Sequence, residues 1–290
     1  MNKFTNILSV VLLSALTSFV ILHFNSSSNK IIKTEKLASD KIIETNILRC
    51  GYAVASPWFM ADPNTKKLSG VGYDITNAIA DKMGVKVKWI EETGWGVAEQ
   101  GIISKRYDVL CGNVCIDPHR ARAITFSNPI FHIPILAVVR KNDPKFTNGD
   151  LSRLNDPSVR IGVKNNHVFE YIANEKFPKA TKIYANDISD DTEFLLMLET
   201  NKVDITFSGQ ATIGLYEKQH PGKVISLPEP ARYCNGAFML PQGDTHLKEM
   251  VDNAIGEINS SGQIGDIIKK HTKLDKRYVL VPAMPFREQN

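Results

Sequence analysis

A short polar segment in the first half of the chain holds residues that could bind a small charged molecule. It reads Asp117-Pro118-His119-Arg120, and Arg122 follows closely. The guanidinium of Arg120 offers a rigid fork of N–H donors that matches the two oxygens of a carboxylate. The alternative for Arg120 is an ordinary surface arginine. Asp117 suits either a cationic group of a ligand or the cap of the next helical turn, and both interpretations stay open.

The four cysteines allow two kinds of chemistry. Cys111, Cys115 and His119 are spaced by four residues, and zinc favours such ligands. Because Cys111 falls in an expected strand and His119 in an expected loop, this spacing does not describe one helix face. Disulfides or buried thiols are the simpler interpretation. If disulfides form, Cys50–Cys111 is the favoured pair, since both lie in strands expected to be neighbours; Cys115 and Cys234 then remain.

Composition places the chain among ordinary globular proteins. It has 290 residues, of which 43% are hydrophobic and 23% charged, enough for one large domain or two small ones. The formal net charge is only +4, and no block of like charge stands out. We therefore expect no nucleic-acid partner.

The N-terminus carries the pattern of an export signal. Lys3 precedes an apolar run over residues 7–24, which is also long enough to span a bilayer. No small-residue cleavage site follows, so a cleaved signal peptide and an uncleaved membrane anchor (residues 1–24) both stay open. Residues 25–46 are expected to form a polar tether. The folded part would then lie in the periplasm, either soluble or anchored to the inner membrane through residues 7–24.

Strand-like and helix-like segments alternate in two series after residue 47. This order predicts an α/β fold whose mostly parallel sheets are flanked by helices. Two apolar passages, near Phe131 and Pro230, interrupt the series. We therefore expect two lobes joined by two crossover strands. Lobe 1 would comprise residues 47–133 and 235–290, and lobe 2 residues 134–234.

Several segments, taken in order, carry a family resemblance. The most specific is Asp117-Pro118-His119-Arg120 followed by Ile124-Thr125-Phe126-Ser127-Asn128-Pro129. Over residues 48–271 the chain resembles the family 3 solute-binding proteins, the periplasmic receptors for polar amino acids. The family writes these segments as Thr-Pro-Glu-Arg and Phe-Ser-Asp-Pro. The resemblance implies a type II periplasmic-binding-protein fold with the ligand between its lobes. Further matching segments are Leu48-Arg49-Cys50-Gly51, Ser56-Pro57-Trp58-Phe59, Gly70-Val71-Gly72-Tyr73-Asp74-Ile75, Tyr107-Asp108-Val109-Leu110 and Ser260-Ser261-Gly262-Gln263.

The resemblance also implies roles for single residues of the first half. Arg120 would hold the α-carboxylate of the ligand, and Trp95 would stack on the ligand. Trp58 is a second candidate wall, and burial in the core is the alternative for both tryptophans. Asn113 and Cys115 lie on a loop that supplies backbone and hydroxyl contacts in the family. A serine or threonine is usual at the position of Cys115.

In the second half, the chain departs from the family pattern. Lys164 stands where the family often has a polar or basic contact. Asn166 and His167 replace a Gly-Thr pair at a helix start, whose free N–H groups attract anions. Ser208 is a further candidate ligand contact. The family carries an aspartate near this position that binds the α-amino group, whereas residues 205–210 hold no carboxylate. This departure puts a standard amino acid in doubt as the ligand. Carboxylates elsewhere that could compensate are Asp74, Asp117 and Glu170.

We therefore expect a monomeric binding protein without a cofactor that captures a small anionic, amino-acid-like metabolite for an ABC permease. An enzyme on the same fold is the alternative, a periplasmic dehydratase resembling cyclohexadienyl dehydratase. Such chemistry needs a general acid, for which Glu170 and His167 are candidates. The Gly-Gly-Thr-Asn-Glu pattern of that enzyme is absent. A metal or redox protein using Cys111, Cys115 and His119 is the other alternative.

Overall fold

The structure is a computed structural model that describes residues 36–146 and 154–272, apart from the side chain of Asn113. The predicted signal or anchor over residues 7–24 lies outside these ranges. In the described ranges, no helix is both long enough and apolar enough to cross a membrane.

Helices and strands alternate along the described chain. The helices are α2 (Ala38–Thr45), α3 (Val71–Met83), η1 (Trp95–Val97), α4 (Ala98–Ile103), η2 (Arg120–Arg122), α5 (Val168–Lys176), α6 (Thr192–Glu199), α7 (Gln210–Gln219), α8 (Thr245–Ser260) and α9 (Gln263–Thr272). The strands are β1 (Ile47–Tyr52), β2 (Met60–Ala61), β3 (Leu68–Ser69), β4 (Lys86–Glu92), β5 (Val109–Cys115), β6 (Ile124–Phe126), β7 (Phe131–Arg140), β8 (Arg160–Val163), β9 (Thr181–Tyr184), β10 (Ile205–Gly209) and β11 (Val224–Pro241).

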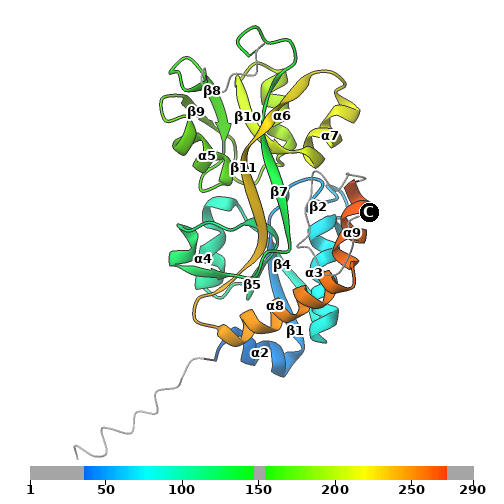
Figure 1. Cartoon of the computed structure of the whole chain (residues 1–290). Coiled ribbons are helices and arrows are strands. Elements are labelled where there is room, and N and C mark those ends of the chain that lie inside the picture. Colours follow the sequence, from blue (N-terminus) through cyan, green and yellow to red (C-terminus); the bar gives the residue numbers. More distant parts are fainter. Residues whose placement is uncertain (1–35, 147–153, 273–290) are drawn as a thin grey trace, which may run out of the picture. The chain divides into compact units, whose positions relative to one another are not determined.

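One sheet runs through two lobes, in the order β4-β1-β5-β11-β7-β10-β8-β9. Lobe 1 contains the parallel strands β4, β1 and β5 with α2, α3, α4, α8 and α9 (Figure 1). Lobe 2 contains the parallel strands β10, β8 and β9 with α5, α6 and α7. The predicted two-lobed α/β fold with mainly parallel sheets is therefore confirmed. Strand β10 is buried along its whole length, as strands covered on both faces of a sheet are.

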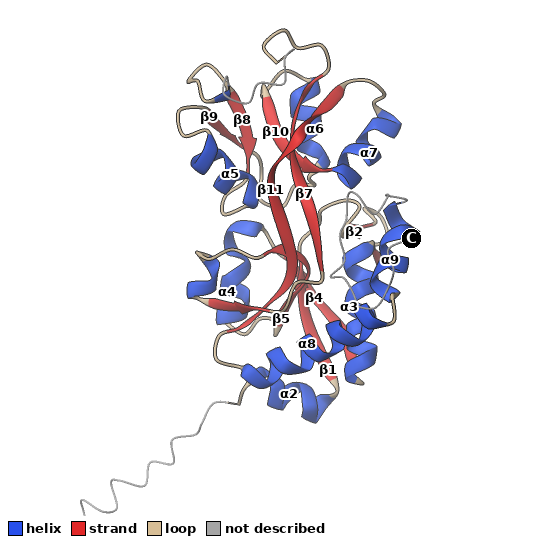
Figure 2. Cartoon of the chain, in the orientation of Figure 1, coloured by secondary structure: helices blue, strands red, loops and turns tan. Residues whose placement is uncertain are grey.

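Two long antiparallel strands, β7 and β11, connect the lobes (Figure 2). At one end Val224 pairs with Arg140, and at the other Gly236 pairs with Phe131. β11 then continues along β5 and β6 in lobe 1. The predicted lobe borders, at residues 133/134 and 234/235, fall inside these two strands. That division of the chain into moving parts stays a prediction.

Helix α2 corrects the expected polar tether over residues 25–46. Residues 38–45 are helical and pack against β1 and α8. Ile42 is fully buried, and the backbone N–H of Ser39 donates to a carboxylate oxygen of Asp244 at 2.9 Å. The helix ends at Asn46, which adopts the left-handed conformation with φ 54°. The tether prediction failed here because one apolar face within a polar segment is a weak signal.

Two disulfides fix lobe 1 and its connection to the crossing strand. Cys50 and Cys111 join β1 to its neighbour β5, with their Cα atoms 5.5 Å apart, as predicted. Cys115 at the end of β5 bonds to Cys234 on β11, with a Cα separation of 5.0 Å. This second bond covalently ties the crossing strand to lobe 1. The alternative of a metal site at Cys111, Cys115 and His119 is wrong, because disulfide sulfurs are not thiolate ligands.

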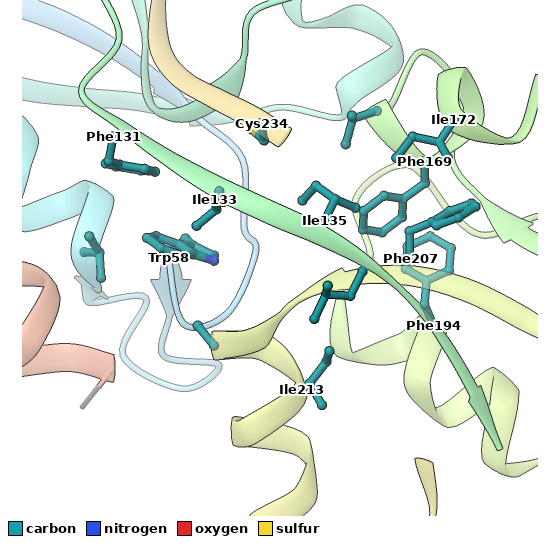
Figure 3. Packing of buried hydrophobic residues seen from close by; sticks show 14 of the residues in the cluster. Trp58, Phe131, Ile133, Ile135, Phe169, Ile172, Phe194, Phe207, Ile213 and Cys234 are labelled. Atoms are coloured by element: carbon teal, nitrogen blue, oxygen red, sulfur yellow. The ribbon is translucent and has the colours of Figure 1, made fainter. Parts of the chain in front are cut away.

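The hydrophobic core continues through the crossing region without a break. Trp58 stacks on Phe131, with ring centroids 5.1 Å apart. Figure 3 shows Ile133 and Ile135 along β7, between this pair and the phenylalanines of lobe 2. Those phenylalanines, Phe169, Phe194 and Phe207, are buried. Packed side chains therefore reach the interlobe region from both lobes and hold its walls in place.

Candidate functional site

A cavity of about 60 Å³ lies between the lobes. Lobe 1 lines it with the loop after β1, the end of β5 and the turn η2, whereas lobe 2 uses the starts of α5 and α7. The crossing strands β7 and β11 form the back wall. The residues that line the cavity include Trp58, Trp95, Cys115, Asp117, Arg120, Ile133, Asn166, His167, Phe169, Tyr171, Asp191, Gly209, Thr212, Arg232 and Cys234.

Arg120 is the buried cation of this cavity. Its side chain is only 6% exposed, and its Nε lies 3.2 Å from a carboxylate oxygen of Glu99. Nη2 donates to the backbone carbonyls of Trp95, at 3.1 Å, and of Asn166. Nη1 is buried and has no hydrogen-bond partner among the described residues. A buried donor without a partner costs about 1–3 kcal/mol, so this atom offers a strong position for an anionic acceptor.

Asp117 caps the turn that presents Arg120. Its Oδ1 accepts hydrogen bonds from the backbone N–H groups of His119, at 2.8 Å, and Arg120, at 3.2 Å. The carboxylate is buried and also lines the cavity. The sequence left two interpretations of Asp117 open, and the structure shows the one in which its side chain caps the turn η2. The position of Asp117 on the cavity wall leaves a ligand contact available as well.

Two aromatic side chains form walls of the cavity, as the sequence suggested. Trp95 is 7% exposed, and its ring lies 5.2 Å from the imidazole of His167 in lobe 2. Trp58 is also buried, through its stack on Phe131. Both tryptophans are thus core residues and wall residues together, so the two interpretations do not exclude each other here.

His167 is a buried, neutral histidine at the start of α5. Burial, with added repulsion from Lys164 and Arg120, holds its pKa well below 6.5. Its Nδ1 accepts the backbone N–H of Phe169 at 3.4 Å and so caps the helix. Since Nδ1 is the acceptor, the proton of the neutral ring is on Nε2.

Asn166 precedes this cap in the left-handed conformation, with φ 51°. Its carbonyl accepts from Arg120, and its amide lies 3.5 Å from the carbonyl of Gly96. Asn166 therefore contacts lobe 1 in two places.

Lys164 and Ser208 do not reach the cavity wall. Lys164 is fully buried, and its ammonium lies 3.0 Å from Oδ1 of Asp191 and donates to the carbonyl of Ser189. A buried ammonium requires such a counter-charge, so Lys164 is connected to the cavity wall through Asp191. Ser208 is buried in β10, and the next residue, Gly209, lines the cavity instead. The side chain of Asn113 lies outside the described residues, whereas Cys115 lines the cavity as half of a disulfide.

Four polar residues of the cavity were missed from the sequence: Asp191, Tyr171, Thr212 and Arg232. Asp191 is the carboxylate that lobe 2 presents; burial is the largest influence and raises its pKa, opposed by Lys164. Tyr171 faces the cavity from α5, and burial raises its pKa. Arg232 comes from the crossing strand β11. The run of aspartates at 187, 190 and 191 before a helix was the available signal for Asp191.

Direct contacts hold the lobes together around the cavity. Asp190 in lobe 2 accepts hydrogen bonds from the backbone N–H of Ser56, at 3.0 Å, and from its hydroxyl, at 2.6 Å. The hydroxyl of Thr212 donates to the carbonyl of Ser56 at 2.9 Å. Gly94 lies so close that an added Cβ would be 2.9 Å from Cβ of Asp187. The described arrangement is therefore one in which the lobes meet.

Comparison with known proteins decides the family. Residues 48–273 match the model of the bacterial extracellular solute-binding proteins, family 3. The chain belongs to this family. Its interlobe cavity accordingly lies where open parallel sheets present the carboxyl ends of their strands.

Individual members of family 3 are similar at moderate identity. The chain is 27% identical to the L-arginine-binding protein of Pseudomonas aeruginosa, with 84% of the chain and 93% of that protein covered. It is 23% identical to an L-cystine-binding protein of Bacillus subtilis, covering 74% and 76%. A crystal structure of an ancestral amino acid-binding protein, a precursor of cyclohexadienyl dehydratase, superposes with a TM-score of 0.70 at 22% identity, covering 82% and 100%. The family 3 fold and its amino-acid-binding relatives agree with the expected class of binding protein.

Proposed function

We propose that this chain captures a small, carboxylate-bearing, amino-acid-like metabolite in the interlobe cavity and delivers it to an ABC permease. The ligand is anionic at the end that meets Arg120. The observation that carries the proposal is the buried Nη1 of Arg120, which has no hydrogen-bond partner among the described residues. Nη2 is already fixed by the carbonyls of Trp95 and Asn166, so the guanidinium is held in position before a ligand arrives.

The surroundings of Arg120 suit the remaining parts of an amino acid. Helices α5 and α7 both begin at the cavity wall, and a helix N-terminus favours negative charge. Asp191 and Asp117 are carboxylates on the wall that could accept an ammonium group. Asp191 thus takes the place of the aspartate that residues 205–210 lack. Trp58, Trp95 and Phe169 supply the apolar walls typical of small-molecule sites.

We further propose a binding protein rather than an enzyme, acting as a monomer in the periplasm. The candidate general acids of the dehydratase alternative support this. Glu170 is not among the cavity residues, and its two oxygens are held by the hydroxyl of Tyr184 and the backbone N–H of Asn166, both at 2.7 Å. His167 is neutral, and its Nδ1 accepts the hydrogen bond that caps α5. Glu170 is thus held by hydrogen bonds away from the cavity, and the neutral ring of His167 is a weak acid.

A thermal-shift screen tests the proposal. The chain without residues 1–35 is heated with each L-amino acid and, in parallel, with the amine that lacks only the carboxylate. A ligand that binds the folded form alone raises the melting temperature. We expect at least one L-amino acid to do so while its matched amine does not. Equal shifts by acid and amine would contradict the carboxylate anchor, and turnover of prephenate or arogenate would favour the enzyme.

A further inference from the structure

A second, wider hollow adjoins the interlobe cavity. This groove has a volume of about 620 Å³, compared with about 60 Å³ for the cavity. Four residues line both spaces: Asp117, Asn166, Tyr171 and Arg232. The groove therefore continues the cavity outward, past the loop at His119 in lobe 1 and helix α5 in lobe 2. A molecule whose head group lies against Arg120 would reach the groove past these four shared residues.

The groove is more polar than the cavity. Its wall adds His119, Asn174 and Glu175 to the shared residues. The ring of His119 stacks at 6.2 Å on Tyr171 of the opposite lobe. An apolar ligand tail would leave these polar groups without partners and gain little from them. The lining thus suits a ligand whose far end is itself polar.

Arg232 is the cation at the junction of the two spaces. Successive side chains of a strand point to opposite faces, and Tyr233 is 58% exposed while Arg232 and Cys234 line the cavity. Within the described ranges, the half-buried guanidinium of Arg232 makes no ion pair or side-chain hydrogen bond, whereas Arg120 is paired with Glu99. The disulfide from Cys234 to Cys115 ties the strand beneath Arg232 to lobe 1. Arg232 is therefore an available cation on an anchored strand.

We propose that the groove is a second subsite for the far end of an elongated ligand, and that Arg232 binds a carboxylate there. The ligand would then be an amino acid with a carboxylate at both ends. This inference rests on the proposed function, since it takes the first carboxylate to be held by Arg120. It makes Arg232 the residue that selects such ligands over amino acids with an apolar tail.

Four probes that share one L-amino-acid end test the inference by calorimetry. L-Norleucine ends in a methyl group, L-2-aminoadipate in a carboxylate, L-lysine in an ammonium, and L-cystine in a second amino-acid group. For the wild-type chain we expect L-2-aminoadipate or L-cystine to bind at least about tenfold more tightly than L-norleucine, as for a charge-assisted hydrogen bond. Arg232→Gln should abolish this difference.

Arg122→Gln is the matched control, because Arg122 is exposed and lines neither space, yet its loss changes the net charge equally. It should preserve the preference for the second carboxylate. The inference is overturned if Arg232→Gln keeps the preference, if L-norleucine binds as tightly as the dicarboxylates, or if L-lysine binds most tightly. No binding of any probe to the wild-type chain would contradict the proposed function itself, together with this inference. An unchanged melting temperature of Arg232→Gln establishes that the variant is folded.

Discussion

The ammonium of Lys164 lies 3.0 Å from Oδ1 of Asp191, directly behind the wall of the interlobe cavity. The lysine is fully buried, and its ammonium also lies 5.2 Å from the ring centroid of Phe194. This pair joins β8 to the residue that precedes α6. Among the described residues of lobe 2, Asp191 is the carboxylate that lines the cavity, and this pair holds it in place.

Removing the lysine should destabilise the fold. In Lys164→Met, Asp191 loses its counter-charge in a buried setting, which typically costs about 3–5 kcal/mol. Adding Asp191→Asn removes the stranded charge and should recover part of the loss. Urea unfolding measures both free energies. Lys176→Met, at an exposed position of α5, should change the free energy of unfolding by less than about 0.5 kcal/mol. Equal stability of Lys164→Met and the wild type would show that the pair contributes nothing.

Gly94 should be required for the lobes to meet. Its backbone, with φ −76°, accepts any L-residue, so Gly94→Ala introduces no strain within lobe 1. The added Cβ would nevertheless approach Cβ of Asp187 in lobe 2 to 2.9 Å. Such overpacking costs about 1–3 kcal/mol, and here it destabilises the arrangement in which the two lobes meet. We expect a weaker affinity for the ligand found by thermal shift and a larger radius of gyration of the ligand-bound chain in X-ray scattering.

Gly214→Ala is the control for this variant, because an added Cβ at Gly214 meets nothing within 4 Å. Its affinity and scattering should match those of the wild type. Wild-type affinity in Gly94→Ala would mean that the described contact between the lobes is not the ligand-bound arrangement.

His167 should make stability depend on pH. Its pKa is well below 6.5 in the folded chain, so the unfolded chain binds more protons as the pH falls through about 6.5. The stability contributed by the neutral ring is complete above that pH and is lost progressively below it. The loss amounts to at most about 1.4 kcal/mol per pH unit, the value for one proton.

His167→Asn keeps a side-chain acceptor for the cap of α5 but does not titrate. Free energies of unfolding from pH 7.5 to 5.5 should therefore fall less steeply in this variant than in the wild type. His271 and His220 remain in both proteins, beside Asp74 and Glu199 respectively, so their effects cancel in the comparison. Parallel pH profiles of the two proteins would contradict the assignment of a neutral, buried His167.

The sequence predicted the role of a site residue where that role depends on neighbouring residues in the chain. It did not do so where the role depends on contacts between residues far apart in the sequence. Arg120 and its cap Asp117 belong to one short segment whose residue types indicated their roles, and the position of Trp95 on the wall followed from the family resemblance. Asp191 could not be found in this way, because its role depends on Lys164, which is 27 residues away on another element. Arg232 was also missed, because its place at the cavity depends on how β11 lies beside residues that are distant in the sequence.

Register explains the other differences in the site. Ser208 and Gly209 are neighbours in β10, but Ser208 is buried and Gly209 lines the cavity. The alternation of side chains along a strand did not specify which of the two residues faces the cavity. The pairing of Cys50 with Cys111 was predictable, because both lie on strands that the α/β order makes neighbours.

In the proposed function, Arg120 holds a carboxylate of the ligand. Calorimetric titration with the L-amino acid that most raises the melting temperature tests it directly, for the wild type, Arg120→Gln and the control Arg122→Gln. Losing a charge-assisted pair should weaken binding by at least about 2 kcal/mol in Arg120→Gln. The exposed Arg122 carries the same charge two residues away, and its variant should bind as the wild type does. A folded Arg120→Gln with unchanged affinity would show that Arg120 does not hold the carboxylate.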